Sequence, residues 1–325
     1  MKGKDDLNFF SMKQLWQSLG ITAVVVGLFL LVVTLTSHGK NHEDAPTGAA
    51  STSTSGAAAA VTAAPAVSPF QNVHISGQAA IVVDLSNGNT LYSQNPDKPL
   101  PLASLTKLLT MYAAGTALSA ASPVTISSTS LEQDGDYGLS LGETFAYKDI
   151  SRFALVGSSN DAAEAIVEAA AQNVSMTPGQ LLARAISSAG LSNTTATNGT
   201  GLDIDATEAG AYGSARDIAR LAEEVLATSP ALAHATTLSS VSVRSLDGTL
   251  HTLPNTNPDA SKLPGMLLSK TGYTDLAGGN LAVIFDAGIN HRVAVVVLGS
   301  THDARFTDVE TLMKATLAQF AQVQK

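Results

Sequence analysis

Apolar and polar residues divide the 325-residue chain into three parts. The first contains an uncharged segment from Gln14 to Ser37, whose apolar centre runs from Leu19 to Leu35. The second, over 38–69, is a low-complexity stretch rich in Ala, Ser, Thr and Gly. From residue 70 onward, apolar residues recur at the spacings of strands and helices. The pattern predicts one folded region, 70–325, preceded by two segments of a different kind.

The folded region is predicted to have strands at both ends and helices in the middle. Alternating apolar residues predict strands at 78–84, 266–271, 279–285 and 293–298, with an Asn-Gly turn at 87–88. Apolar residues at helical spacing predict helices at 104–118, 148–156, 161–171, 177–189, 214–228 and 303–323. This order is typical of an α/β (α+β) fold in which an antiparallel sheet, built from both ends of the region, packs on helices.

The apolar segment near the N-terminus has the length of a membrane span. A helix from Leu15 to Ser37 covers roughly 30 Å, the thickness of a bilayer's hydrocarbon core. Three lysines precede the segment, and mixed charges follow it, so the positive-inside rule places the N-terminus in the cytoplasm. A cleaved signal peptide is the alternative, but the apolar run is long for one and no Ala-x-Ala site follows Leu35.

The low-complexity stretch contains too few apolar residues to fold by itself. Val61 and Val67 are its only large apolar side chains, so burial cannot offset the entropy of ordering it. We interpret it as a disordered linker, in which a metal site at His38 and His42 is improbable. The sequence thus predicts a single-pass protein of the cell membrane, with a cytoplasmic segment 1–17, a transmembrane anchor 18–37, a linker 38–69 and an extracytoplasmic domain 70–325.

Composition excludes several classes of function. Charged residues make up 14% of the chain and the net charge is −9, without a cluster of Lys and Arg, which argues against nucleic acid as a partner. Cysteine is absent, which excludes disulfides, thiolate metal sites and thiol catalysis. The histidines of the folded region have no mutual spacing that indicates a metal site, and we expect no metal or other cofactor.

One lysine stands alone in an apolar stretch. Lys107 is the single charge between Pro99 and Leu131, in the run Ser-Leu-Thr-Lys-Leu-Leu that begins at Ser104. Residues three apart share a helix face, so Ser104 and Lys107 are neighbours. A lysine buried in such a helix has a lowered pKa and can act as a general base toward the serine. The simpler interpretation is a lysine whose amine reaches the surface beside an ordinary serine.

Two later triplets complete a set with this Ser-x-x-Lys pair. Ser158, Ser159 and Asn160 form a Ser-x-Asn triplet between two predicted helices, where helix capping is the simpler interpretation. Lys270 begins a Lys-Thr-Gly triplet at the end of a predicted strand, where a solvated strand end is the simpler interpretation. The occurrence of Ser-x-x-Lys, Ser-x-Asn and Lys-Thr-Gly in this order favours a catalytic set over coincidence.

With these motifs, the chain resembles the D-alanyl-D-alanine carboxypeptidases. These are the low-molecular-mass penicillin-binding proteins, within the penicillin-recognising serine enzymes, and the resemblance extends over about 78–320. It also includes the lead-in to Ser104, the triplet Asn255-Thr-Asn257 and the residues around Tyr212. Leu102 stands where relatives usually have Pro, and Ser159 where they often have Gly. The resemblance implies a β-lactamase/transpeptidase-like fold, with an antiparallel sheet flanked by helices and a helical subdomain.

The resemblance implies a role for each residue of the first two motifs. Ser104 would attack the carbonyl of a D-Ala-D-Ala bond and form an acyl-enzyme, while Lys107 takes its proton. Ser158 would relay a proton to the leaving amine, and Asn160 would orient Lys107 and the substrate amide. The backbone N–H groups of Ser104 and Tyr273 would form the oxyanion hole.

The third motif would hold the substrate. Lys270 and Thr271 would bind the terminal carboxylate, and Gly272 would let the substrate backbone approach the strand. Arg305 would assist with that carboxylate, with a surface charge at a helix start as the alternative. Because both lysines would face Ser104, their repulsion lowers the amine pKa further, and activity should fall at acid pH.

The implied function is a membrane-anchored serine-type D-Ala-D-Ala carboxypeptidase of cell-wall peptidoglycan biosynthesis and cell shape. Its partners would be peptidoglycan stem peptides and β-lactams, the latter as covalent inhibitors. A DD-endopeptidase of peptidoglycan cross-links would use the same residues and stays open. A class A-like β-lactamase would need a Glu-x-x-Leu-Asn motif, which the scan of the glutamates of the folded region does not find. A non-enzymatic wall-binding protein would lack one of the motifs, and none is missing.

Overall fold

The computed structural model describes residues 68–288 and 291–323. The predicted cytoplasmic segment 1–17, the anchor 18–37 and all but the end of the linker 38–69 lie outside these residues and stay predictions. Within the described ranges, no helix is both long and apolar enough to cross a bilayer.

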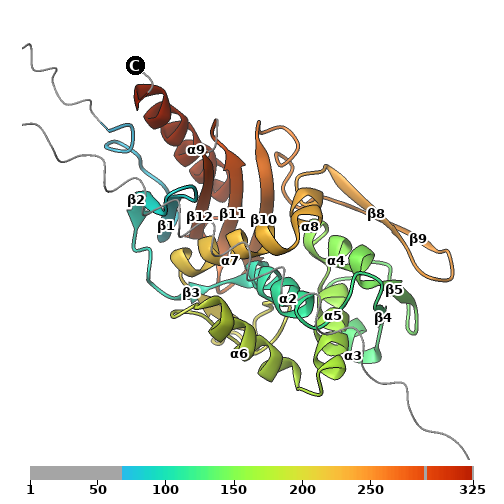
Figure 1. The fold of residues 1–325 in the computed structure, drawn as a ribbon. Coiled ribbons are helices and arrows are strands. Elements are labelled where there is room, and N and C mark those ends of the chain that lie inside the picture. The colour runs from blue at the N-terminus through green and yellow to red at the C-terminus, as the bar shows by residue number, and fades with distance from the viewer. Residues whose placement is uncertain (1–67, 289–290, 324–325) are drawn as a thin grey trace, which may run out of the picture. The chain divides into compact units, whose positions relative to one another are not determined.

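A five-stranded antiparallel sheet is formed from the two ends of the folded region (Figure 1). Its strand order is β10-β11-β12-β1-β2. The strands are β1 (Ala79–Asp84), β2 (Asn89–Gln94), β10 (Met266–Thr274), β11 (Gly278–Asp286) and β12 (Arg292–Ser300). The first strand pairs with the last, with Ile81 opposite Val296, and β10 is an edge strand. The predicted sheet assembled from both ends is therefore confirmed.

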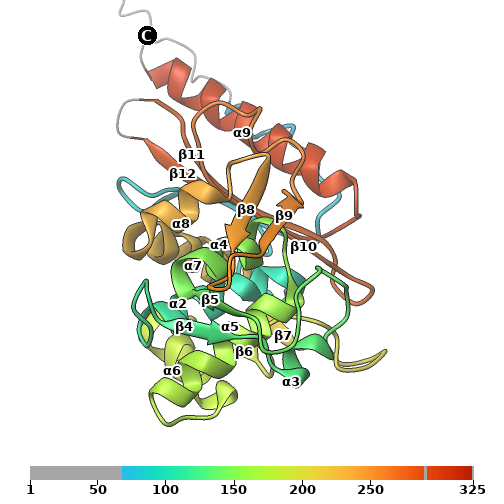
Figure 2. The ribbon, with the colours of Figure 1, turned by 90° about the vertical axis from the view of Figure 1, so that its right-hand side faces the viewer.

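Helices cover both faces of this sheet. The long helix α9 (Ala304–Val323) packs on one face, where Val283, Val295 and Leu312 share a buried cluster. The other face, with Leu268 and Ile284, is covered by η1 (Ala103–Leu105), α7 (Ala215–Thr228) and α8 (Pro230–Ala235) (Figures 1 and 2). The other helices pack against these three and against one another: α2 (Thr106–Gly115), α3 (Ser128–Leu131), α4 (Tyr147–Val156), α5 (Asn160–Asn173) and α6 (Pro178–Ala189).

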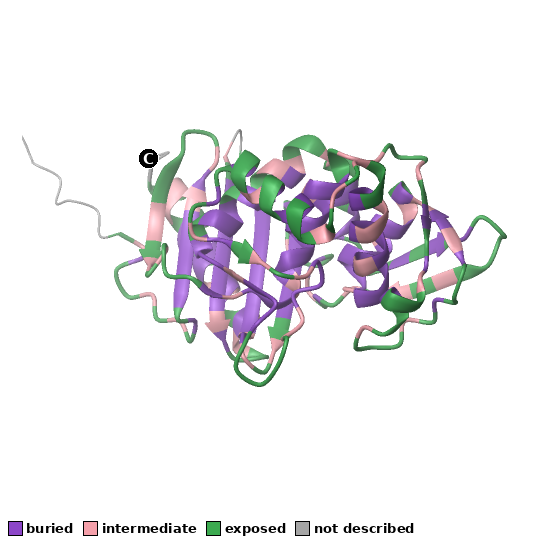
Figure 3. Cartoon of the chain, turned by 90° about the horizontal axis from the view of Figure 1, so that it is seen from below, coloured by how far each residue is buried: buried purple, intermediate pink, exposed green. Residues whose placement is uncertain are grey.

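Residues of both apolar faces are buried, which explains the near-continuous apolar runs of the inner strands. Strands β1, β10, β11 and β12 carry mostly buried residues, whereas the edge strand β2 and the outer sides of the helices are more exposed (Figure 3). Three small sheets join the helices. They pair β3 (Leu100–Pro101) and β6 (Thr195–Ala196) with β7 (Ala211–Gly213), β4 (Pro123–Thr125) with β5 (Thr144–Ala146), and β8 (Ser240–Arg244) with β9 (Leu250–Pro254).

The observed elements differ from the predicted ones in three ways. The helix predicted over 104–118 begins as the 3-10 turn η1 and ends at Gly115. The strand predicted over 266–271 continues to Thr274, so the Lys-Thr-Gly triplet lies within β10 and not at its end. The helices α3 and α8 and the hairpin β8–β9 were not predicted, because short elements carry too few apolar repeats to stand out.

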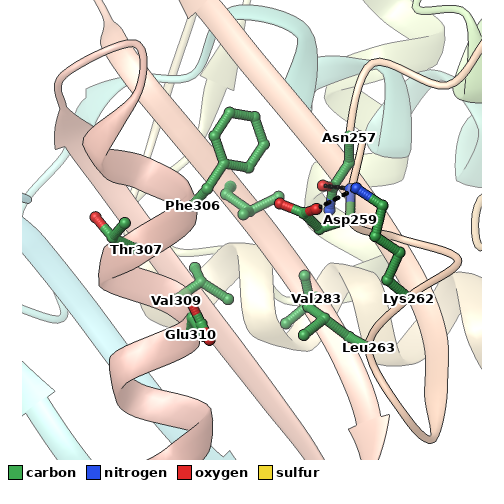
Figure 4. A pocket seen from close by; sticks show the side chains of 10 residues that line it. Asn257, Asp259, Lys262, Leu263, Val283, Phe306, Thr307, Val309 and Glu310 are labelled. Carbon is green, nitrogen blue, oxygen red and sulfur yellow. Dashed lines mark hydrogen bonds and ion pairs between the residues drawn. The ribbon is translucent and has the colours of Figure 1, made fainter.

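A cavity of about 220 Å³ lies on the α9 face of the sheet. Leu281 and Val283 of β11 form its floor, and Phe306 and Val309 of α9 form one wall (Figure 4). Charged residues of the segment before β10, including the ion-paired Asp259 and Lys262, line the opposite wall. None of the predicted catalytic residues lines this cavity.

One buried carboxylate joins the start of the folded region to α9. Asp308 accepts hydrogen bonds from the backbone N–H groups of Ser76 and Gly77, at 2.9 and 3.0 Å, and from Ser300 Oγ at 2.6 Å. Hydrogen bonds to charged groups contribute more than neutral ones. We predict that Asp308→Asn lowers the free energy of unfolding by about 1.5–3 kcal/mol in urea denaturation, because the amide disrupts this set of bonds.

Glu310→Gln is the matched control for that measurement. Glu310 lies on the same helix and forms an exposed ion pair with Lys314, so its loss should cost less than about 1 kcal/mol. Equal effects of the two variants would contradict the assigned role of Asp308.

Candidate active site

The structure brings the three sequence motifs together at the edge strand β10. Ser104 lies in the turn η1, and Lys107 lies in the first turn of α2 and is fully buried. The Lys107 amine is 2.9 Å from Ser104 Oγ, 2.7 Å from Asn160 Oδ1 and 2.8 Å from the carbonyl oxygen of Thr200. One amine therefore contacts the hydroxyl of Ser104 and two carbonyl oxygens.

These contacts suit an uncharged amine. Burial lowers the pKa of Lys107 to about 7. A neutral amine has two N–H donors and one lone pair, and the oxygens of Asn160 and Thr200 can only accept. In the neutral state, both N–H groups donate to those oxygens, and the lone pair faces Ser104 Oγ, whose O–H then donates to it. Lys107 thus has the geometry of a general base.

Within the Ser-x-Asn triplet, one residue caps a helix and the other two contact the buried lysines. Ser159 caps α5, because its hydroxyl accepts from the Ala162 N–H at 3.1 Å. Ser158, the residue before it, has a left-handed backbone with φ 59°. Asn160 begins α5, and its amide nitrogen donates to the Asp134 carbonyl at 2.6 Å, which fixes its oxygen toward Lys107. The capping interpretation therefore holds for Ser159 alone.

Lys270 is the second buried amine of the site. It is 1% exposed, and its Nζ donates to Ser158 Oγ and to the Thr271 carbonyl, both at 2.9 Å. Burial lowers its pKa well below the usual value, and the nearby Lys107 and Arg305 lower it further. The interpretation as a solvated strand end is contradicted by this burial.

Gly272 lets β10 lie directly against the turn that carries Ser104. A Cβ atom at Gly272 would lie 2.9 Å from the Leu102 carbonyl oxygen and 3.3 Å from the Ala103 Cβ. Any side chain would therefore separate the strand from the turn. Tyr273 follows, is 48% exposed, and its ring packs edge-on against His302 with centroids 4.9 Å apart.

Arg305 is a buried cation, so the alternative of a surface charge is contradicted. It is 5% exposed and lies in the first turn of α9, where the helix dipole disfavours a positive charge. One guanidinium nitrogen donates to the Gly272 carbonyl at 2.7 Å, while Nε has no partner within the described structure. Burial lowers the pKa of Arg305, and the nearby Asp303 raises it. An anionic ligand at Nε would stabilise the buried cation further.

Sequence reasoning missed several residues that complete the site. Thr200 supplies a backbone carbonyl to Lys107 from the Gly-Thr-Gly segment 199–201. Thr256 places its Oγ1 2.6 Å from the Thr271 Oγ1. It is the middle residue of the Asn-Thr-Asn triplet, so the resemblance marked the segment without a role. Asn280 is fully buried and donates to the Leu102 carbonyl.

The histidines take part in hydrogen bonds and not in a cluster. His251 is bonded to Glu143 at 2.6 Å, and His302 to Asp303 at 2.7 Å. Across the described ranges, no group of three His, Cys, Asp or Glu residues could hold a metal ion.

Comparison with known proteins identifies the family. The family model described as D-alanyl-D-alanine carboxypeptidase, peptidase S11, matches residues 62–302.

The chain belongs to the D-alanyl-D-alanine carboxypeptidase family. It is 28% identical over 249 residues to D-alanyl-D-alanine carboxypeptidase DacF of Bacillus subtilis, covering 75% of this chain and 62% of DacF. It is 36% identical over 118 residues to a D-alanyl-D-alanine endopeptidase of Pseudomonas aeruginosa, covering 34% of this chain and 37% of that protein. The chain thus spans less than two thirds of these curated relatives.

A solved structure extends the likeness to the fold. The ampicillin-bound form of penicillin-binding protein D2 from Listeria monocytogenes has 29% sequence identity and a TM-score of 0.64. The match covers 75% of this chain and 98% of that one. The resemblance seen in the sequence and the α/β transpeptidase-like fold are thereby confirmed.

The lowered pKa of Lys107 predicts how acylation by penicillin depends on pH. Only the neutral amine can accept the Ser104 proton, so the second-order acylation rate should be constant above about pH 8 and fall toward tenfold per pH unit below 7. Labelled penicillin at pH 5 to 9 measures this rate, and melting temperatures at each pH verify that the protein stays folded. A flat profile would exclude Lys107 as the base.

Proposed function

We propose that this chain is a membrane-anchored serine-type D-Ala-D-Ala carboxypeptidase, which removes the terminal D-alanine from peptidoglycan stem peptides. The observation that carries the proposal is the 2.9 Å contact between Lys107 Nζ and Ser104 Oγ, with both other contacts of the amine made to carbonyl oxygens. A serine whose neighbour is a buried, uncharged amine is an activated nucleophile.

The reaction would proceed in two steps. In the first, Ser104 Oγ adds to the carbonyl carbon between the two D-alanines, as its proton passes to Lys107. Ser158 then relays the proton held by Lys107 to the leaving amine, the C–N bond breaks, free D-alanine departs, and an ester remains on Ser104. In the second step, water adds to the ester carbonyl as Lys107 accepts one of its protons. The bond between the acyl carbon and Ser104 Oγ then breaks, the proton passes from Lys107 to Oγ, and the shortened peptide leaves with a new terminal carboxylate. The backbone N–H groups of Ser104 and Tyr273 would hold the oxyanion in both steps.

The charges around β10 favour a substrate that ends in a carboxylate. Lys270 and Arg305 are both buried, and neither forms an ion pair with an acidic side chain within the described ranges. A substrate carboxylate near Thr271 would compensate them. The unpartnered Nε of Arg305 supports this assignment.

The covalent intermediate gives the most direct test of the function. We predict that penicillin adds its own mass to the intact wild-type protein and that Ser104→Ala, which keeps the fold, gains none. Mass spectrometry of the two proteins measures the adduct. An adduct on the variant, or none on the folded wild type, would overturn the assignment of Ser104.

A DD-endopeptidase is the second candidate, and the 36% identical relative of that name favours keeping it. The same residues would cut a cross-link. Whether the enzyme prefers a stem peptide or a cross-link would depend on the substrate groove beyond the catalytic residues. Release of D-alanine from a pentapeptide, compared with cleavage of a cross-linked dimer, decides between the two activities.

A class A-like β-lactamase is disfavoured, because no glutamate of the described ranges hydrogen-bonds to Ser104, Lys107 or Asn160. Turnover of a chromogenic cephalosporin should therefore be slow.

We further infer that residues 18–37 hold the catalytic domain at the outer face of the cell membrane. The uncharged run between Gln14 and Ser37 and the lysines before it support this. We predict that the full chain sediments with membranes at high salt and that a chain lacking 1–37 does not. External protease should then remove the domain from spheroplasts, and protection from that protease would contradict the orientation.

A further inference from the structure

One buried side chain connects the sheet to the turn that carries the nucleophile. Asn280 of β11 is fully buried, and its Nδ2 donates to the carbonyl oxygens of Pro101 at 2.9 Å and of Leu102 at 3.0 Å. Its Oδ1 accepts from the Gly299 N–H of the neighbouring strand at 2.8 Å. Both amide hydrogens and the oxygen therefore have partners, and the two donors end on consecutive peptides just before Ser104.

The turn it holds has an unfavourable backbone conformation. Ala103 has φ 48°, in the left-handed region that is unfavourable for a residue with a Cβ atom. Such a residue persists only where the surroundings determine its conformation. The left-handed residue directly precedes Ser104, so it sets the direction of both the hydroxyl and the backbone N–H of the nucleophile.

Two glycines leave room for the turn, but a glycine has no side chain that could hold it by a hydrogen bond. Gly272 allows the Leu102 carbonyl to approach β10, and a Cβ at Gly201 would lie 1.9 Å from the Ala103 carbonyl oxygen. The Leu102 carbonyl also accepts from the Leu105 N–H at 3.2 Å. Asn280 is therefore the side chain that fixes the two peptides before Ala103 from the side of the sheet.

We propose that Asn280 is a positioning residue of the proposed acyl transfer. By holding the peptides of Pro101 and Leu102, it keeps Ala103 left-handed. It thereby aligns Ser104 Oγ with Lys107 and the Ser104 N–H with the developing oxyanion. This inference rests on the proposed function of Ser104.

Asn280→Asp tests the inference with the least change in shape. The carboxylate keeps an acceptor for Gly299 and loses both donors to the turn. We expect the acylation rate constant for penicillin to fall about 30-fold or more, since misplaced donors and nucleophiles cost factors of about 100. Deacylation should slow by a similar factor, because it uses the same oxyanion donors. The dissociation constant of the complex that precedes acylation should change less than about twofold.

A pH profile provides a readout that loss of stability alone would not give. A protonated aspartic acid has one O–H donor and restores one of the two bonds. The ratio of variant to wild-type acylation rates should therefore rise as pH falls, opposite to the effect of protonating Lys107. Each rate is measured at a temperature at which both proteins are folded.

Val283→Ala is the control, because Val283 lies on the same strand and faces α9. It should lower the melting temperature through a lost packing contact and leave acylation within about twofold of wild type. Asn280→Ser, which is smaller and also loses the bonds to the turn, serves if the aspartate variant does not fold.

The inference is overturned if a folded Asn280 variant is acylated at a rate within about twofold of wild type. It is also overturned if Val283→Ala and the Asn280 variant lose equal melting temperature and equal acylation rate. A wild-type chain that penicillin does not label would instead overturn the proposed function itself.

Discussion

The site depends on keeping an amine uncharged inside the protein. Removing Lys107 from water disfavours its charged form, and its neighbours in the chain, Leu105 of η1 and Leu108 and Leu109 of α2, are all buried as well. A carboxylate beside the amine would reverse the effect by favouring the ammonium form. In the described part of the chain, the oxygen atoms hydrogen-bonded to the Lys107 amine all belong to uncharged groups, the Ser104 hydroxyl and the carbonyls of Asn160 and Thr200.

This requirement explains how charge is distributed over an acidic protein. The net charge is −9, yet Lys107, Lys270 and Arg305 are buried, and within the described ranges none of them forms an ion pair with an acidic side chain. Lys107 and Arg305 lower the pKa of Lys270 beyond the effect of its burial, and repulsion between buried groups of like sign opposes folding. An anionic substrate would relieve that repulsion, so binding and the readiness for catalysis draw on the same three side chains.

Two residues of the site have an unfavourable backbone conformation. Ala103 and Ser158 are both left-handed without being glycine; Ala103 directly precedes Ser104, and Ser158 itself carries a hydroxyl of the proposed catalytic set. For Ser158, the turn between α4 and α5 directs its hydroxyl to Lys270 while the next residue caps the helix. Residues in this conformation are expected where function and not local preference sets the backbone.

The sequence was sufficient to predict the sheet, the main helices and the three motifs, because these depend on periodicity and on residue types at short spacing. It could not indicate Thr200, Asn280 or Thr256, whose contributions come from a backbone carbonyl or from pairing across elements. The burial of Arg305 was also unpredictable, since a charged residue at a helix start is usually solvated. Such roles follow from the tertiary fold and leave no local pattern.

The pairing of β1 with β12 has a consequence for biosynthesis. Ala79 lies opposite Leu298, and the strands carrying Lys270 and Asn280 are also made late. Contacts between residues so distant along a chain form slowly and only after the last strand has emerged. A nascent polypeptide that has exposed Ser104 therefore still lacks the second amine and the support of the turn. The proposed catalytic set is therefore complete only after the last strands have been synthesised and paired.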